Sequence, residues 1–189
     1  MIPQLLLLTG APAIGKTRLA AALAQHYGAC LCSKDEIKEL LFDTLGERDA
    51  QWSRALSHAS FALLFAYAPR LLSRQRLLLL EGNFRTGEHE VSLAAILSSS
   101  AAGMAQILCQ ADAATRAARL AARAADPSRH AGHRDCETDT AASGGATFLD
   151  LPGPRWLFSS DTPGPRQWQA LRRRIDRWRA QPRARVGKQ

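Results

Sequence analysis

The chain has 189 residues, 46% hydrophobic and 22% charged, a composition that suits one globular domain with a buried core. Its longest aliphatic runs, 5–8 and 77–80, are far shorter than the roughly 20 apolar residues that span a bilayer, and no signal peptide is recognisable, so the sequence predicts a cytoplasmic protein without a membrane span. The net charge of +8 lies within residues 166–188, which hold nine basic residues and one acid, while the rest of the chain is neutral. This basic segment is either solvated surface or a contact for a polyanion.

Apolar runs and helical patterns alternate along the chain. Strands are predicted over Gln4–Thr9, 29–33, 76–81, 104–110 and 155–160. Helices are predicted over Lys16–Tyr27, 35–45, 50–73 with a bend near residue 69, 88–99, 112–125 and from 165 to about 182. This alternation is typical of an α/β fold in which helices cover both faces of a parallel sheet. We expect a single domain over residues 1–181, a mobile polar loop over 126–145, and a basic disordered tail over 182–189.

The segment between the first strand and the first helix carries the most specific motif. Residues 10–17 fit G-x-x-x-x-G-K-[ST] in the strand–loop–helix setting that a phosphate-binding P-loop needs. Its glycines let the backbone approach a phosphate, and the amides at the helix start point at the anion. Lys16 is expected to reach the β- and γ-phosphates of ATP, or alternatively GTP, and the Thr17 hydroxyl to bind Mg²⁺. The predicted nucleotide contacts here are Gly10, Ala11, Pro12, Ala13, Ile14, Gly15, Lys16, Thr17 and Arg18.

A carboxylate follows the second predicted strand. Because the carboxyl ends of parallel strands form the ligand crevice, Asp35 is expected to face the same crevice as the P-loop. There it can orient an acceptor hydroxyl and take its proton, so Asp35 is the candidate catalytic base. Capping of a helix that begins at Glu36 is the alternative role, and the two roles are compatible.

The segment Ser33-Lys34-Asp35-Glu36-Ile37-Lys38 and the P-loop together resemble small P-loop kinases. This AAA-type ATP-binding group includes chloramphenicol phosphotransferase, zeta toxin and polynucleotide-kinase-like proteins, and the resemblance covers most of residues 4–162. It implies a three-layer P-loop NTPase fold with strand order 2-3-1-4-5 and a base at Asp35.

The resemblance also implies an acceptor side. Lys38, one helical turn beyond Asp35, stands where the group often has a basic residue, so it is expected to hold an anionic acceptor or the transferring phosphoryl group, with a surface role as the alternative. The region with Trp52, His58, Phe61 and Tyr67 builds the acceptor pocket in such kinases, although these spacings also fit a helix core.

Residues 77–84 stand where such kinases carry a Walker-B-like strand. Glu81 replaces the more usual aspartate, so a water-mediated Mg²⁺ contact or substrate binding is expected in place of direct metal ligation. Asn83 and Arg85 are expected to project from the following loop into the crevice as acceptor-side residues.

A lid is implied at about residues 112–145. Arg116, Arg119 and Arg123 share one face of the predicted helix, and in the resembling kinases such arginines close over the ATP phosphates. Guanidinium groups suit this task because they bind phosphate oxygens bidentately and stay charged. Arg119 and Arg123, the nearer to the lid, are the predicted catalytic pair, and a solvated arginine face is the alternative.

Two further segments carry candidate ligands. The resemblance implies that Asp161 and Thr162, which end the last strand, border the adenine base, with a helix cap as the alternative. His130 and His133 near Cys136 are expected either to contact phosphate or substrate from the lid or to be plain surface. Their spacing matches no established zinc site.

These features predict a phosphotransferase that moves the γ-phosphoryl group of ATP to a hydroxyl of a small molecule, with Mg²⁺. Catalysis is assigned to Asp35, Lys16, Arg119 and Arg123. A 5′-hydroxyl nucleic-acid kinase that holds its polymer with the basic tail is one alternative. A nucleotide-dependent switch without an acceptor is another, although a switch has little use for Asp35 and Lys38. The sequence leaves the acceptor's identity and the oligomeric state open.

Overall fold

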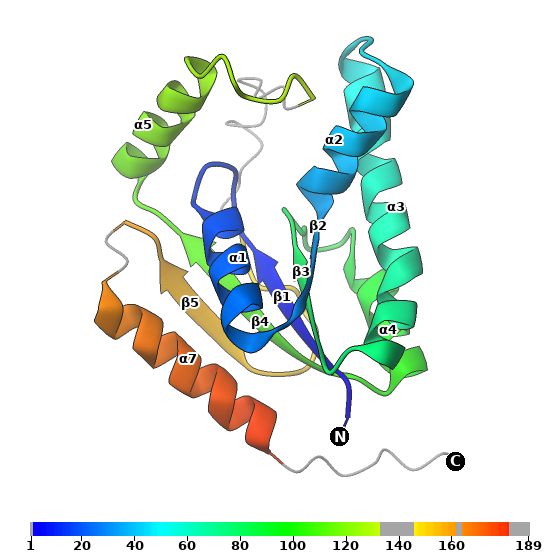
Figure 1. The fold of residues 1–189 in the computed structure, drawn as a ribbon, viewed down its shortest axis with the longest axis vertical. Helices are drawn as coiled ribbons and strands as arrows, with labels where there is room; N and C mark the ends of the chain where they lie inside the picture. The colour runs from blue at the N-terminus through cyan, green and yellow to red at the C-terminus, as the bar shows by residue number, and fades with distance from the viewer. Residues whose placement is uncertain (1, 133–145, 162–163, 182–189) are drawn as a thin grey trace.

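The computed structural model describes residues 2–132, 146–161 and 164–181 (Figure 1). Among these residues the chain forms five strands and six helices. In chain order they are β1 (Gln4–Thr9), α1 (Lys16–Tyr27), β2 (Cys30–Ser33), α2 (Lys34–Leu45), α3 (Ala50–Arg74), β3 (Leu77–Glu81), α4 (Glu90–Ser100), β4 (Gly103–Gln110), α5 (Ala113–Ala124), β5 (Arg155–Ser159) and α7 (Pro165–Ala180). The predicted elements are all present, and their bounds differ from the predicted ones by one or two residues, the usual uncertainty at element ends.

The strands form one sheet in the order β2-β3-β1-β4-β5, and every neighbouring pair is parallel. This confirms the predicted order and the three-layer P-loop NTPase fold. Strand β1 lies at the centre, where the run Leu5–Leu8 is wholly buried because helices cover both faces of the sheet.

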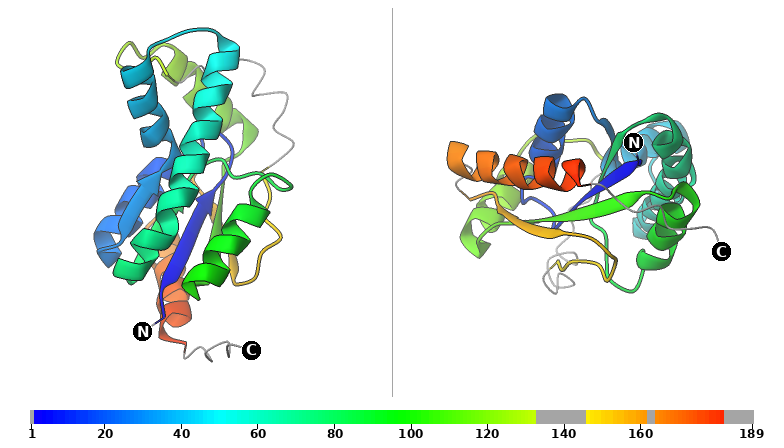
Figure 2. Two further views of the ribbon diagram at one scale, coloured as in Figure 1. Left: turned by 90° about the vertical axis from the view of Figure 1, so that its right-hand side faces the viewer. Right: turned by 90° about the horizontal axis from the view of Figure 1, so that it is seen from below.

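Alternate residues of β1 face two separate cores. Leu6 and Leu8 pack with α1 and α7 on one face, while Leu5 and Leu7 pack with α3 and α4 on the other. The views in Figure 2 show these helix pairs on opposite sides of the sheet. Among the described residues, no helix combines the length and apolar character needed to cross a bilayer.

Helices α2 and α3 form a hairpin that rises past the carboxyl ends of the strands (Figure 1). The predicted helix that contains Pro69 continues through it as the 25-residue α3. Across the carboxyl edge from this hairpin stands α5, so the P-loop lies between the two. The proposed domain boundary at residue 181 is the last described position, and the tail 182–189 and the lid residues 133–145 lie outside the described residues.

Candidate active site

The P-loop adopts a backbone that requires glycine at its first position. Gly10 has φ +146°, and a Cβ there would contact the Ile14 side chain and stand 2.6 Å from the carbonyl oxygen of Cys109. At the other end Gly15, with φ +85° in the left-handed region, is the N-cap of α1. The loop therefore folds back over the start of α1, where amide groups gather.

Lys16, the first residue of α1, crosses the loop from inside. The residue is only 8% exposed, and its Nζ donates a hydrogen bond to the carbonyl of Ala11 at 2.9 Å. Burial lowers the pKa of Lys16, and the charges of Glu81 and then Asp35 oppose that shift. The following Thr17 and Arg18 are exposed at the start of the helix. The ammonium group is thus held at the mouth of an anion cradle.

Glu81 ends β3 directly beside this lysine. It is 0% exposed, and one carboxylate oxygen, Oε2, accepts a hydrogen bond from the Ser33 hydroxyl at 2.7 Å. The other oxygen, Oε1, has no hydrogen-bond partner among the described residues. Burial raises the pKa of Glu81, against the opposing charge of Lys16. A buried carboxylate oxygen left without a donor beside an anion cradle fits a hydrated Mg²⁺ bound with a nucleotide.

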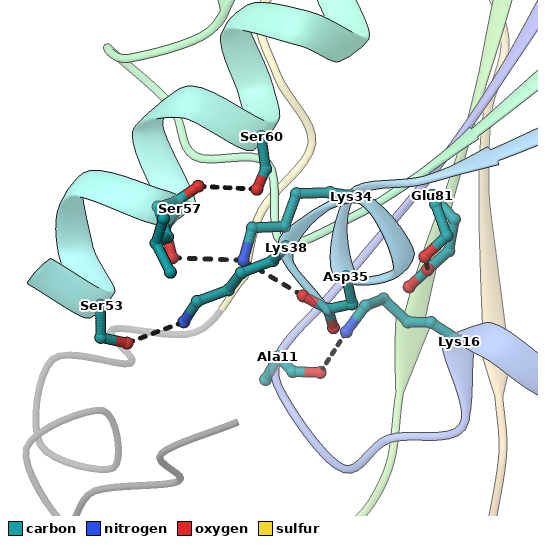
Figure 3. Close-up of polar contacts among 11 residues, drawn as sticks. Ala11, Lys16, Lys34, Asp35, Lys38, Ser53, Ser57, Ser60 and Glu81 are labelled. Atoms are coloured by element: carbon teal, nitrogen blue, oxygen red, sulfur yellow. Dashed lines mark hydrogen bonds and ion pairs between the residues drawn. The ribbon is translucent and has the colours of Figure 1, made fainter. Parts of the chain in front are cut away.

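Asp35 lies between two ammonium groups (Figure 3). Its Oδ1 accepts from Lys34 Nζ at 3.1 Å, and its charge also acts on Lys16. The carboxylate is 43% exposed, so a ligand can reach it. Helix α2 begins at Lys34 with Ser33 as N-cap, which makes Asp35 the second helical residue. The alternative that Asp35 caps a helix beginning at Glu36 is therefore wrong, since the helix begins at Lys34 and Asp35 is inside its first turn.

Two lysines of α2 are buried against α3. Lys34 is 5% exposed, and its Nζ is 3.4 Å from the Ser57 hydroxyl, while Lys38 is 8% exposed and donates to the Ser53 hydroxyl at 3.0 Å. Lys38 thus does not have the surface environment that was its alternative. Neither Lys34 nor the α3 serines were predicted. The i,i+4 spacing of Lys34–Lys38 and of Ser53–Ser57 was visible in the sequence, but the pairing of α2 with α3 was not.

The α5 arginines lie over the P-loop. Arg119 donates from Nη1 to the Ser160 hydroxyl at 2.8 Å and from Nη2 to the Ser160 carbonyl at 2.6 Å. Arg116, which was not in the predicted pair, donates from Nε to the carbonyl of Pro12 at 3.3 Å. Arg123 is close enough to lower the pKa of Lys16 by charge repulsion. The shared helix face therefore points at the P-loop side of the site.

The remaining predicted contacts are placed less uniformly. The Oδ1 of half-buried Asn83 is itself buried and has no hydrogen-bond partner among the described residues. Arg85 is exposed and pairs with Glu88 at 3.5 Å, so the structure does not bring it to Asp35. Asp161 accepts from the amide of Asp112 at 2.8 Å and from the Ser159 hydroxyl at 2.8 Å, which ties β5 to the start of α5. Its partner in the prediction, Thr162, lies outside the described residues.

The segment after α5 reaches the α2–α3 hairpin. His130 Nε2 is 2.9 Å from Asp43 Oδ1, and its ring meets Phe42 edge-on with centroids 5.5 Å apart. Thus His130 contacts α2 from the lid side. His133 and Cys136 lie outside the described residues.

The long insert supplies a wall to the site through one of its four predicted aromatic or histidine residues. The Phe61 ring lies 5.8 Å from Lys34 Nζ and packs against His89, with centroids 4.1 Å apart. By contrast, His58 and Tyr67 are exposed, and Trp52 donates from its indole to the carbonyl of Gly46 at 3.0 Å.

Comparison with known proteins fixes the family. The AAA domain family matches residues 5–140, more than half of the chain. The chain belongs to this family. Among solved structures, a protein from Chloroflexus aurantiacus J-10-fl, named provisionally as a kinase, is 31% identical over 94% of this chain and 99% of its own, with a TM-score of 0.86. Among curated proteins no significant match was found.

Two more distant solved structures share the fold of the present protein. The APS kinase CysC of Mycobacterium tuberculosis, solved with AMPPNP and APS, has a TM-score of 0.57 at 14% identity and covers 93% of this chain and 96% of its own. A gluconokinase from Sinorhizobium meliloti 1021 has a TM-score of 0.51 at 14% identity and covers 90% of this chain and 89% of its own. The resemblance to small P-loop kinases found in the sequence is thereby confirmed at the level of family and fold.

Proposed function

We propose that this protein transfers the γ-phosphoryl group of ATP to a hydroxyl of a small molecule. The observation that carries the proposal is the place of Asp35: its carboxylate is accessible and stands beside the P-loop lysine. A nucleotide switch needs the P-loop but no second carboxylate at this point, whereas a kinase needs a base within reach of the transferred group.

Each residue has a definite part in this proposal. The loop 10–15 and the start of α1 hold the phosphates. When a nucleotide binds, Lys16 Nζ gives up its hydrogen bond to the Ala11 carbonyl and binds a phosphate oxygen instead. Thr17 and Glu81 would hold Mg²⁺, Thr17 through its hydroxyl and Glu81 through water, a role for which Glu81 Oε1 has no competing hydrogen-bond partner among the described residues. Bound Mg-ATP supplies the phosphoryl group and a positive charge beside it. Arg119 and Arg123 stabilise the charge that develops on the transferred group.

Asp35 acts on the acceptor. It accepts the hydroxyl proton as the acceptor oxygen bonds to phosphorus, and the bond from phosphorus to the bridging oxygen breaks to leave ADP. Lys34 keeps the carboxylate in place through its 3.1 Å contact. The basic helix α7 runs back toward the amino ends of the strands, away from α2, the helix that carries Asp35, which favours a small acceptor over a nucleic acid (Figure 1).

The test is a screen of ADP release with a panel of hydroxyl acceptors and 5′-hydroxyl oligonucleotides, with Asp35→Asn as the matched variant. We expect Asp35→Asn to bind ATP as the parent protein does in calorimetry but to lose acceptor phosphorylation by roughly 10²–10⁴-fold. Near-normal acceptor turnover in Asp35→Asn would remove the base from the proposal, and turnover of oligonucleotides alone would support the nucleic-acid kinase.

A further inference from the structure

Beyond Asp35, as seen from the P-loop, lies a set of polar side chains, of which the proposed phosphotransfer uses only Lys34, to hold Asp35 in place. We call it the lysine–serine cluster: Lys34 and Lys38 from α2, and Ser53 and Ser57 from α3. In Figure 3 these side chains lie between the two helices, with Asp35 on the side nearer Lys16. Lys34 and Lys38 are one helical turn apart, as are Ser53 and Ser57, so the four form two facing rungs.

Both ammonium groups are largely out of water. The side chain of Lys34 is 6% exposed, and the whole residues Lys34 and Lys38 are 5% and 8% exposed. Burying an ammonium group is costly unless charge and hydrogen bonds compensate it. The compensation seen for Lys34 consists of Asp35 at 3.1 Å, a long contact of 3.4 Å to the Ser57 hydroxyl, and the Phe61 ring at 5.8 Å.

The charge balance of Lys34 depends on Asp35, which changes during the proposed reaction. When Asp35 takes the acceptor's proton, its negative charge is neutralised, and the buried Lys34 loses its counter-ion. The negative charge of Asp35 also acts on Lys16, and Lys16 would bind a phosphate of the nucleotide. A second negative charge supplied by the acceptor would keep Lys34 compensated throughout.

The cluster is held in position before any ligand arrives. The backbone directly after β3 approaches so closely that a Cβ on Gly82 would be 3.2 Å from the Lys34 Cβ and 3.6 Å from the Phe61 ring. The hydroxyls of Ser53 and Ser57 come from a continuous helix and can each donate a hydrogen bond. A role in packing alone would be served better by apolar side chains of similar size, since these carry no desolvation cost.

We propose that the lysine–serine cluster binds an anionic group of the acceptor while the acceptor's hydroxyl lies at Asp35. The substrate class is therefore a hydroxyl compound that carries a carboxylate, a sulfate or a phosphate. This inference rests on the proposed function for the hydroxyl end, but binding of the anion can be measured without phosphotransfer.

The first experiment titrates sulfate into protein saturated with Mg-AMPPNP, so that the P-loop is already filled, and follows binding by calorimetry. We expect saturable sulfate binding that weakens at least about tenfold in Lys34→Met and about two- to fivefold in Ser57→Ala. Ser73→Ala, an exposed serine on the same helix, is the matched control and should bind as the parent does. If Lys34→Met fails to fold by circular dichroism, Ser57→Asp replaces it and is expected to abolish sulfate binding.

The second experiment compares paired acceptors: gluconate with glucose for a carboxylate, and ribose 5-phosphate with ribose for a phosphate. Preference for the anionic member, lost in Lys34→Met, supports the proposal and identifies the group. Absence of sulfate binding in the AMPPNP-saturated protein, sulfate binding unchanged by the cluster variants, or equal turnover of both members would overturn it. Failure of the proposed function is a separate result, seen as no acceptor-dependent ADP release while the sulfate titration still gives the expected pattern.

Discussion

Lys16 and Glu81 share a buried corner of the site, and each affects the protonation of the other. Burial lowers the pKa of Lys16 and raises that of Glu81, so desolvation favours the neutral form of both, while their opposite charges resist this. A phosphate bound in the loop would add negative charge beside Lys16 and favour its ammonium form. These two residues are therefore suited to a site whose charge changes when a nucleotide binds.

Replacing Lys16 tests the anion cradle directly. We expect Lys16→Ala to reduce phosphotransfer by at least about a hundredfold, because it removes the charge that stabilises the transferred phosphates. The fold should survive, since the change takes a buried ammonium out of a low-dielectric corner. Calorimetry with Mg-ATP and ADP release are the measurements, and unchanged affinity and turnover would contradict the assignment of the P-loop.

Gly10 tests whether the loop backbone depends on glycine. Gly10→Ala adds a Cβ 2.6 Å from the Cys109 carbonyl at φ +146°, so we expect a loss of about 2–5 kcal/mol in unfolding free energy from strain and overpacking. Gly28→Ala is the matched control, because Gly28 has φ +58° and nothing lies within 4 Å of its Cβ position. It should cost about 1 kcal/mol. Urea unfolding of both variants measures the two losses of unfolding free energy. Equal losses in Gly10→Ala and Gly28→Ala would contradict the requirement for glycine at position 10.

At the scale of elements, an aromatic cluster joins α3 to the segment after β3. Phe61 and Phe65 of α3 pack against Phe84 and His89. His89 Nδ1 accepts a hydrogen bond from the amide of Arg85 at 2.9 Å, so its imidazole ring is held on a defined side. Because Phe61 also lies beside Lys34, this cluster supports the α2–α3 hairpin at the site.

The aromatic cluster predicts a pH dependence of stability. Burial lowers the pKa of His89 below its ordinary value near 6.5, so the unfolded chain binds this proton at a higher pH than the folded one. The contribution of His89 to stability is therefore complete above about pH 6.5 and is lost as the pH falls toward its folded pKa. In His89→Phe this loss should vanish, although the missing acceptor costs about 1 kcal/mol at higher pH. Thermal unfolding of both proteins between about pH 8 and pH 5 measures this pH dependence. Identical slopes of stability against pH in the parent protein and in His89→Phe would contradict the prediction.

At the scale of the whole molecule, the net charge and the active site are separated. The described basic residues after position 165 lie on α7, which packs on the α1 side of the sheet. Its buried residues Leu171, Ile175 and Trp178 anchor the helix, and the arginines between them face outward or lie at the edge of the contact. The excess charge is thus tied to a helix that contributes core packing rather than to the carboxyl edge of the sheet.

Removing residues 182–189 tests what the basic tail does. We expect the truncated protein to keep its stability and its turnover of a small acceptor, because α7 ends at Ala180 and retains its buried residues. The measurements are ADP release and oligonucleotide binding at two salt concentrations, with the intact protein as the control. Salt-sensitive oligonucleotide binding that disappears on truncation together with acceptor turnover would favour the nucleic-acid kinase.

The sequence by itself determined the fold and the P-loop side of the proposed site. The leucine runs at 5–8 and 77–80, the glycines at 10 and 15, and the cap at Asp112 are local signals, since each depends on a few neighbouring residues. Tertiary structure alone decided the side where we propose that the acceptor binds. The burial of Lys34 depends on α3 packing beside α2, and the burial of Glu81 depends on the parallel pairing of β3 with β1 and β2. The spacing of residues within one segment shows which of them share a face, but it does not show which other segment packs against that face.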